Sequence, residues 1–229
     1  MDLSYYKTLV FDCDGVILNS NKVKTKAFYE AALPYGEYEA RELVAYHIKH
    51  GGISRYTKFE TFLRDIVKIP ITAQALDQLL GSYASEVQHG LLHCETASGL
   101  EALRDATSHA RWAVVSGGDQ AELRSVFAQR NIDLWFDAGI FGSPDDKDTI
   151  LAREFGSGKL VRPAIFLGDS RYDHEAAIRA KLDFVFVSGW SEFHGFEAYC
   201  KDHYLVEISK VIDLLCSRKP IQGGNTHGI

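Results

Sequence analysis

The sequence predicts an α/β fold in which a parallel sheet carries an all-helical insertion after its first strand. Two observations support this. Short apolar runs without polar alternation, typical of parallel strands covered by helices on both faces, lie at 9–11, 112–115, 164–167 and 184–187. Residues 19–94, in contrast, show helical periodicity and no convincing strand. The chain therefore combines a sheet-based unit with a helical one.

Composition excludes several classes of protein. The 229 residues are enough for one large domain or for a domain with a smaller insert. A net charge of −6 argues against a nucleic-acid-binding surface. The four cysteines show no metal-binding spacing and predict reduced thiols in the cytoplasm. No apolar run reaches the ~20 residues of a membrane span, and the first residues lack a signal peptide, so we expect no membrane partner.

The insertion reads as four helices. Val23, Ala27 and Ala31 recur at i, i+4 and i+8 in the first, which Pro34 and Gly36 end. The others are expected over 39–49, after Ser54 and after Thr72. These boundaries predict a helical cap domain over 19–94, an α/β core over 1–18 and 95–220, and a loose tail over 221–229.

From residue 98 the pattern alternates between helices and strands. Ser98 and Glu101 fit a capping box, and Asp119 with Glu122 fits the start of the next helix. A weaker strand is expected over 136–140, followed by a helix beginning at Ser143–Pro144. Further helices are predicted over 176–180 and 207–216.

Polar residues follow the predicted strands. Asp12 and Asp14 leave the first strand pointing the same way, and their mutual repulsion favours a divalent cation, for which Mg²⁺ is the default. A bare D-x-D is also common in solvated turns. Ligands of parallel sheets bind beyond the carboxyl ends of the strands. The later strands bring Ser116, Lys147 and Asp169 to this edge, with Asp173 one turn beyond.

These positions together resemble the four motifs of the haloacid-dehalogenase-like superfamily, in its phosphatase and phosphomutase branch. Asp12–Val16 resembles the first motif, Ser116 the second, Lys147 the third and Gly168–Asp173 the fourth. The resemblance covers essentially the whole chain. It implies a Rossmann-like core with an inserted helical cap. Gly52–Arg55 also resembles a substrate-recognition segment of the β-phosphoglucomutase branch.

The resemblance implies roles for the core residues. Asp12 would attack phosphorus and form an aspartyl-phosphate, and Asp14 would act as general acid and then base. Mg²⁺ would be held by Asp12, the Asp14 backbone carbonyl and Asp169. Asp173 is a further candidate ligand, although Ser170-x-x-Asp173 equally fits a structural helix cap.

The remaining candidates bind phosphate or substrate. Ser116 and the Gly117 N–H, expected at the start of a helix, would contact the phosphate, and Lys147 would hold both nucleophile and phosphate. Without the other motifs, Ser116 would read as a strand-end serine and Lys147 as a solvated surface lysine. Arg55 would bind the part of the substrate away from the phosphate, with Lys24 and Lys58 as weaker candidates.

The sequence thus predicts a Mg²⁺-dependent phosphomonoester hydrolase acting on a small metabolite such as a sugar phosphate, a sugar-acid phosphate or a phosphoglycolate-like compound. Two positions depart from the family pattern. Asn19 replaces an aspartate that often follows the first motif, and Lys24 stands where the mutase branch has its acid/base histidine. Lys24 disfavours a phosphomutase, which remains the nearest alternative. A phospho-accepting signalling module is the alternative from another class.

Overall fold

A six-stranded parallel sheet organises the molecule, for which a computed structural model describes residues 1–216. The strand order is β3-β2-β1-β4-β5-β6, and each neighbouring pair is parallel. The strands are β1 (Thr8–Phe11), β2 (Arg111–Asp119), β3 (Gly139–Ser143), β4 (Ala164–Gly168), β5 (Asp183–Val187) and β6 (Val206–Ile208). The first strand in the chain is therefore in the middle of the sheet, between β2 and β4. The predicted α/β class is confirmed.

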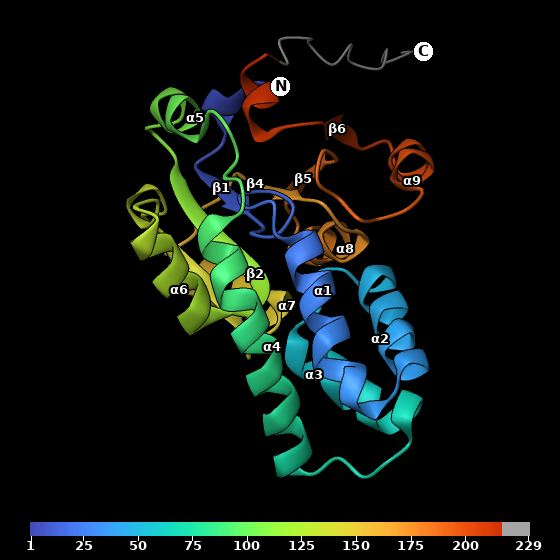
Figure 1. Cartoon of the computed structure of the whole chain (residues 1–229). Helices are drawn as coiled ribbons and strands as arrows, with labels where there is room; N and C mark the ends of the chain where they lie inside the picture. The colour runs from blue at the N-terminus through green and yellow to red at the C-terminus, as the bar shows by residue number, and fades with distance from the viewer. Residues whose placement is uncertain (217–229) are drawn as a thin grey trace.

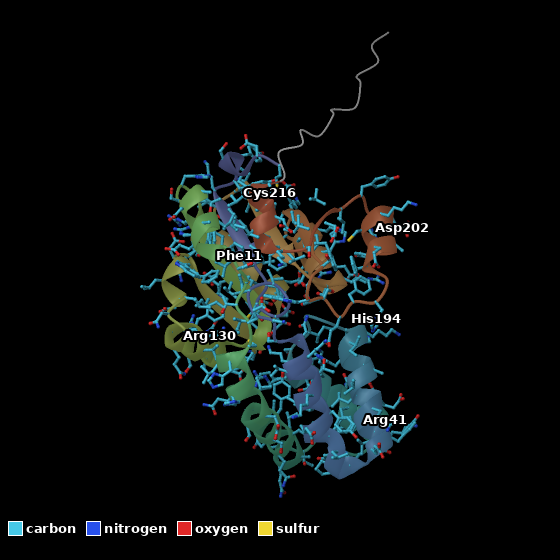
Figure 2. All side chains as sticks on the ribbon, turned by 45° about the horizontal axis from the view of Figure 1, so that its top comes forward. Phe11, Arg41, Arg130, His194, Asp202 and Cys216 are labelled. Atoms are coloured by element: carbon cyan, nitrogen blue, oxygen red, sulfur yellow. The ribbon has the colours of Figure 1, made fainter. Side chains whose placement is uncertain are left out.

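Helices cover both faces of the sheet, as the unbroken apolar strands predict. They are α5 (Leu100–Ala106), α6 (Gln120–Gln129), α7 (Lys147–Gly156), α8 (Arg171–Arg179) and α9 (Phe196–Asp202). Phe11 shares a buried apolar cluster with Leu103 of α5 and Phe127 of α6. Val10, on the opposite side of the strand, packs in a second cluster with α7 and α8. Figure 2 shows Phe11 among the elements of this core.

Residues 19–94, which we call the cap, fold as helices between β1 and β2. They are α1 (Asn21–Ala32), α2 (Glu37–Lys49), α3 (Arg55–Thr61), a π-helical turn (Phe62–Val67) and α4 (Ala73–His93). Figure 1 shows these helices grouped at one end of the molecule, with α5 and β6 towards the other end. The rings of Phe28, Phe59 and Tyr83 pack against one another inside the cap, with centroids 4.5–5.8 Å apart. Arg41, by contrast, is on its outer surface (Figure 2).

The chain enters and leaves the cap through two adjacent segments. The Asn19 N–H donates to the Glu95 carbonyl at 2.9 Å, and the Ala97 N–H donates to the Ile17 carbonyl at 2.8 Å. The Arg130 guanidinium of the core donates to the Cys94 carbonyl at 2.6 Å. The two junctions are thus joined by backbone hydrogen bonds.

Several predicted boundaries were wrong. Ser98 does not cap α5, because Gly99 in a left-handed conformation (φ 77°) precedes the helix. The strand predicted over 136–140 lies at 139–143, because a 3₁₀ turn over residues 133–135 ends at Phe136. The apolar ring of Phe136 packs in the core against Phe11 but is not part of a strand. The helix expected from Ser143–Pro144 starts at Lys147, where the Asp146 carboxylate accepts from the Thr149 N–H at 2.7 Å.

The end of the chain also differs from prediction. The helix expected over 207–216 is replaced by β6 and a 3₁₀ turn (Val211–Leu215). β6 pairs with β5, and the Asp213 carboxylate then accepts from the Lys210 N–H at 2.8 Å, which begins the turn. The sequence reading missed α9. The tail predicted over 221–229 lies outside the described residues, and within 1–216 no helix is long and apolar enough to cross a membrane.

Candidate active site

The carboxyl ends of the three central strands converge on one cavity. Asp12 directly follows β1, and its N–H donates to Leu167 of β4 at 2.9 Å. Asp169 follows β4, and Ser116 lies near the end of β2. The cavity has a volume of about 530 Å³ and is lined by core residues, including Asp12, Asp14 and Asp169, and by cap residues, including Lys24, His47 and Lys58. Helices and sheet therefore share this site.

A buried lysine connects Asp12, at the end of β1, with Asp173 of α8. Lys147, the first residue of α7, donates to Asp12 Oδ1 at 2.8 Å and also to Asp173 Oδ1. Its side chain is 1% exposed, so it is not a solvated surface lysine. Burial raises the pKa of Asp12 to about 7 against the opposing charge of Lys147, and Asp173 raises it further.

Asp12, Asp169 and Asp173 form a buried carboxylate cluster. Each offers one oxygen, and the three oxygens lie within 4.8 Å of one another. Burial and then the charges of Asp173 and Asp12 raise the pKa of Asp169 well above its usual range. Crowded carboxylates with oxygen ligands suit a divalent cation of the Mg²⁺ type, which would offset this repulsion. The cluster therefore fits the predicted metal.

Asp173 also stabilises the start of α8, as the sequence suggested. Its Oδ2 accepts from the Ser170 hydroxyl at 2.6 Å and from the Ser170 N–H at 3.1 Å, which completes a capping box. Because its other oxygen binds Lys147, this one carboxylate orients both the helix and the lysine.

Asp14 is not one of the three carboxylates of the cluster, and its hydrogen-bond partners are residues of the cap. Lys24 Nζ and the Ser20 hydroxyl each donate to its carboxylate at 2.5 Å. Burial opposes ionisation, but the charge of Lys24 and the hydrogen bonds from Lys24 and Ser20 outweigh it and lower the pKa of Asp14. Asp14 is thus an ionised carboxylate in this arrangement.

The end of β2 approaches the cap closely. Ser116 is fully buried, and its hydroxyl oxygen accepts from the Gly118 N–H at 3.0 Å. A Cβ at Gly117 would overlap the carbonyl oxygen of Gly52, which belongs to the turn between α2 and α3. Gly117 lies within β2 and not at a helix start, since α6 begins at Gln120. The expectation that its N–H belongs to a helix N-terminus was therefore wrong.

The family of the chain follows from its sequence. A sequence model of haloacid dehalogenase-like hydrolases matches residues 6–181. The chain belongs to the haloacid dehalogenase-like hydrolase family. A search of curated proteins found no match.

Solved structures share the fold of this hydrolase. A predicted phosphoglycolate phosphatase from Haemophilus somnus 129PT has a TM-score of 0.72 and 16% identity, with coverage of 96% of this chain and 100% of that chain. A predicted phosphatase from Clostridium acetobutylicum has a TM-score of 0.71 and 18% identity (91% and 96% covered). A haloacid dehalogenase-like protein from Streptococcus pneumoniae has a TM-score of 0.66 and 17% identity (94% and 100%). At these identities the likeness shows the fold alone.

Arg55 of the hydrolase forms a contact between cap and core. Its guanidinium donates through two nitrogens to the Glu122 carboxylate of α6, one of these bonds being 3.1 Å long. It also lies 4.6 Å from the centroid of the Tyr83 ring. Arg55, whose side chain is 6% exposed, thus has a partly buried anionic partner from the protein itself. This geometry favours a role in positioning the cap.

Lys58 lies one turn beyond Arg55 and has different surroundings. Its Nζ is 2.7 Å from His47 Nδ1 and 5.4 Å from the centroid of the Phe28 ring. Lys58 is 2% exposed, yet it lines the cavity. Burial, reinforced by the charge of Lys24, lowers the pKa of Lys58 to about 7.

Sequence reasoning missed three residues of the site. Asn21, the first residue of α1, donates to Asp169 Oδ2 at 2.7 Å and to the Trp190 carbonyl at 2.9 Å. His47 and Glu122 are the partners of Lys58 and Arg55. No local pattern distinguishes any of them, because their partners lie 11–148 residues away in the chain.

Proposed function

We propose that this hydrolase is a Mg²⁺-dependent phosphomonoesterase that acts on a small phosphorylated metabolite through an aspartyl-phosphate at Asp12. The observation that carries the proposal is the buried Asp12 carboxylate at the carboxyl end of β1, which accepts a hydrogen bond from Lys147. Asp14 lies two residues further along the chain. The family, and the similarity of the fold to proteins described as predicted phosphatases, support a phosphate substrate.

The proposed chemistry assigns one task to each core residue. An oxygen of Asp12 attacks phosphorus, and the bond between phosphorus and the substrate alcohol breaks. Lys147 orients Asp12 and attracts the phosphate, while the Ser116 hydroxyl and the Gly117 N–H donate to its oxygens. When bound, Mg²⁺ held by Asp12, the Asp14 carbonyl and Asp169, with Asp173 in support, neutralises charge on the phosphoryl group.

Asp14 is proposed to act first as the general acid and then as the general base. In its protonated form it gives a proton to the departing alkoxide, and as a carboxylate it then removes one from the water that attacks the aspartyl-phosphate. That attack releases inorganic phosphate and restores Asp12. The ion pair with Lys24 holds Asp14 ionised in the substrate-free arrangement, so the proposal requires Asp14 to take up a proton when the substrate binds; the ionised form then serves the second step.

The cap explains why hydrolysis is a better proposal than the alternatives. The cavity is bounded by both cap and core residues, which suits a small substrate sequestered beneath a movable cap. A signalling module has no need of such an enclosure. Lys24, at the position of the mutase histidine, is bonded to Asp14, which favours a hydrolase over a phosphomutase.

A substrate panel tests the proposal. The purified protein, with Mg²⁺, is incubated with phosphorylated sugars, sugar acids and short hydroxy acids, and inorganic phosphate and phosphorylated isomers are both measured. We expect phosphate release that Asp12→Asn abolishes. Isomer formation without net phosphate release would instead indicate a mutase, and an aspartyl-phosphate that persists without turnover would indicate a signalling module.

A further inference from the structure

Three buried cationic side chains of the cap belong to the cavity wall, and two of them have anionic partners. Lys24 is paired with Asp14, and Arg55 is paired with Glu122. Lys58 forms no ion pair within the part of the chain that the structure describes, and its hydrogen bond is to the imidazole of His47. The cavity therefore has one buried amine without a counter-charge.

The surroundings hold this amine in place. His47 Nδ1 is 2.7 Å from Lys58 Nζ, and the His47 ring packs on Phe28 with centroids 4.5 Å apart. Lys58 Nζ is itself 5.4 Å from the Phe28 centroid. An ammonium group has three donors, of which His47 accepts one, so the others remain for a ligand in the cavity.

An unpaired charge is expensive to bury, whereas a charge that meets an opposite charge on the ligand is not. We propose that the substrate of the phosphatase carries a second anionic group, a carboxylate or a second phosphate, on its alcohol portion, and that Lys58, supported by His47, binds it. This inference rests on the proposed function. It favours acidic substrates, such as phosphorylated hydroxy acids, over neutral sugar phosphates.

The protonation state of Lys58 depends on whether an anion occupies this subsite. Burial and the charge of Lys24 lower the pKa of Lys58 to about 7, and burial with the charge of Lys58 keeps His47 neutral by lowering its pKa well below the usual range. Other charged groups that act on Lys58 are Asp14, Lys147 and Asp12. In the empty cavity at pH 8 the amine is therefore mostly neutral, and the charge of a bound anion raises the pKa of Lys58, so that the amine takes up a proton from the solvent.

Kinetics with matched substrates test the inference. The probes are 2-phosphoglycolate, ethane-1,2-diol bisphosphate and the neutral 2-hydroxyethyl phosphate. The variants are Lys58→Met and, as a control, Lys26→Met at an exposed lysine of α1. We expect wild type to prefer one of the two acidic probes, which tells carboxylate from phosphate. Lys58→Met should lower kcat/KM for that probe about 10- to 100-fold, mainly through KM, as for a hydrogen bond between charged groups.

For Lys58→Met the loss with the neutral probe should be much smaller than the loss with the acidic probe, because the neutral probe has no charge for Lys58 to bind. The control Lys26→Met should change kcat/KM for every probe by less than about twofold, since surface substitutions have small effects. Equal losses on acidic and neutral probes would show a structural role for Lys58 and overturn the inference. So would a wild type that prefers the neutral probe.

A binding measurement keeps this result separate from the proposed function. Calorimetric titration of Asp12→Asn with the two acidic probes, at pH 8 in two buffers of different ionisation enthalpy, should show proton uptake that Asp12→Asn/Lys58→Met lacks. Absence of hydrolysis with all probes would contradict the phosphatase. Equal proton uptake in the two proteins, or no binding of either probe, would overturn the subsite.

Discussion

A single methyl group at Gly117 should prevent the cap from seating on the core. In Gly117→Ala the new Cβ would overlap the Gly52 carbonyl oxygen and lie 3.0 Å from the Gly52 carbonyl carbon and 3.3 Å from that of Ile53. All three atoms belong to the backbone, so no side-chain rotation relieves the clash. Gly117 does not have a positive φ, and alanine keeps the N–H that is proposed to bind phosphate.

The contact distances set the size of the effect. Non-bonded carbon and oxygen atoms lie about 3.3 Å apart or more, so relief of the overlap with the Gly52 carbonyl oxygen requires the turn to retreat by about 1 Å. Overpacking of this kind costs about 1–3 kcal/mol, and a misplacement of about 1 Å can cost 10²-fold in rate. We expect kcat/KM for an aryl phosphate to fall about 10- to 100-fold, while the melting temperature changes little because the open cap leaves the methyl group in solvent.

Gly81→Ala provides the matched control. Gly81 lies in α4 with no atom within 4 Å of an added Cβ, so alanine there should keep full activity and raise stability by about 0.5–1 kcal/mol. Wild-type kcat/KM in Gly117→Ala would refute the reasoning, since the close approach of Gly52 would then have no part in the active arrangement. Loss of the folded state would place the clash in the core itself.

Four further predictions follow from the site. Asp12→Asn should abolish turnover of every substrate while circular dichroism stays native, and activity beyond what deamidation supplies would contradict the covalent mechanism. EDTA should stop turnover and Mg²⁺ should restore it. Ca²⁺ should inhibit the enzyme, because it is larger and tolerates more carboxylate oxygens. Full activity in metal-free buffer would contradict the carboxylate site. Arg55→Ala should lower kcat/KM equally for aryl phosphate and metabolite and cost about 1.5–3 kcal/mol of unfolding free energy, because the partly buried Glu122 loses its charged hydrogen-bond partner. A loss of activity confined to the metabolite would show substrate binding instead. The pKa of Lys58 falls from 10.5 to about 7 on folding, so the unfolded chain binds more protons than the folded chain between these pH values. Chemical denaturation of the substrate-free protein should therefore show a free energy of unfolding that rises with pH across that window, relative to Lys58→Met. Parallel pH profiles of the two proteins would refute this.

The strand ends could be predicted because a buried parallel strand is recognisable from a single short run of apolar residues. Once the apolar runs at 9–11 and 164–167 were recognised, the positions of Asp12 and Asp169 at one edge followed from parallel topology. The dual use of Asp173 was half visible, since its spacing from Ser170 predicts the cap of α8 but not the bond to Lys147.

Edge elements and contacts between distant segments were not predictable in this way. β6 is three residues long and pairs on one side, so its sequence has no periodicity to detect. The pairing of Arg55 with Glu122 depends on how the cap sits over α6, which no local pattern encodes. For the same reason, the burial of Lys58 beside His47 emerged only from the packing of α3 on α2.

The paired junctions of the cap have a consequence for the history of this protein. Because residues 19 and 95 are joined by a backbone hydrogen bond, the helical insertion interrupts the parent sheet at one point and leaves its strand order intact. A duplicated gene could replace this segment or lengthen it without a new folding problem for the strands. Substrate preference and bond-breaking chemistry can then diverge at separate rates, so orthologues are expected to vary most between these two junctions.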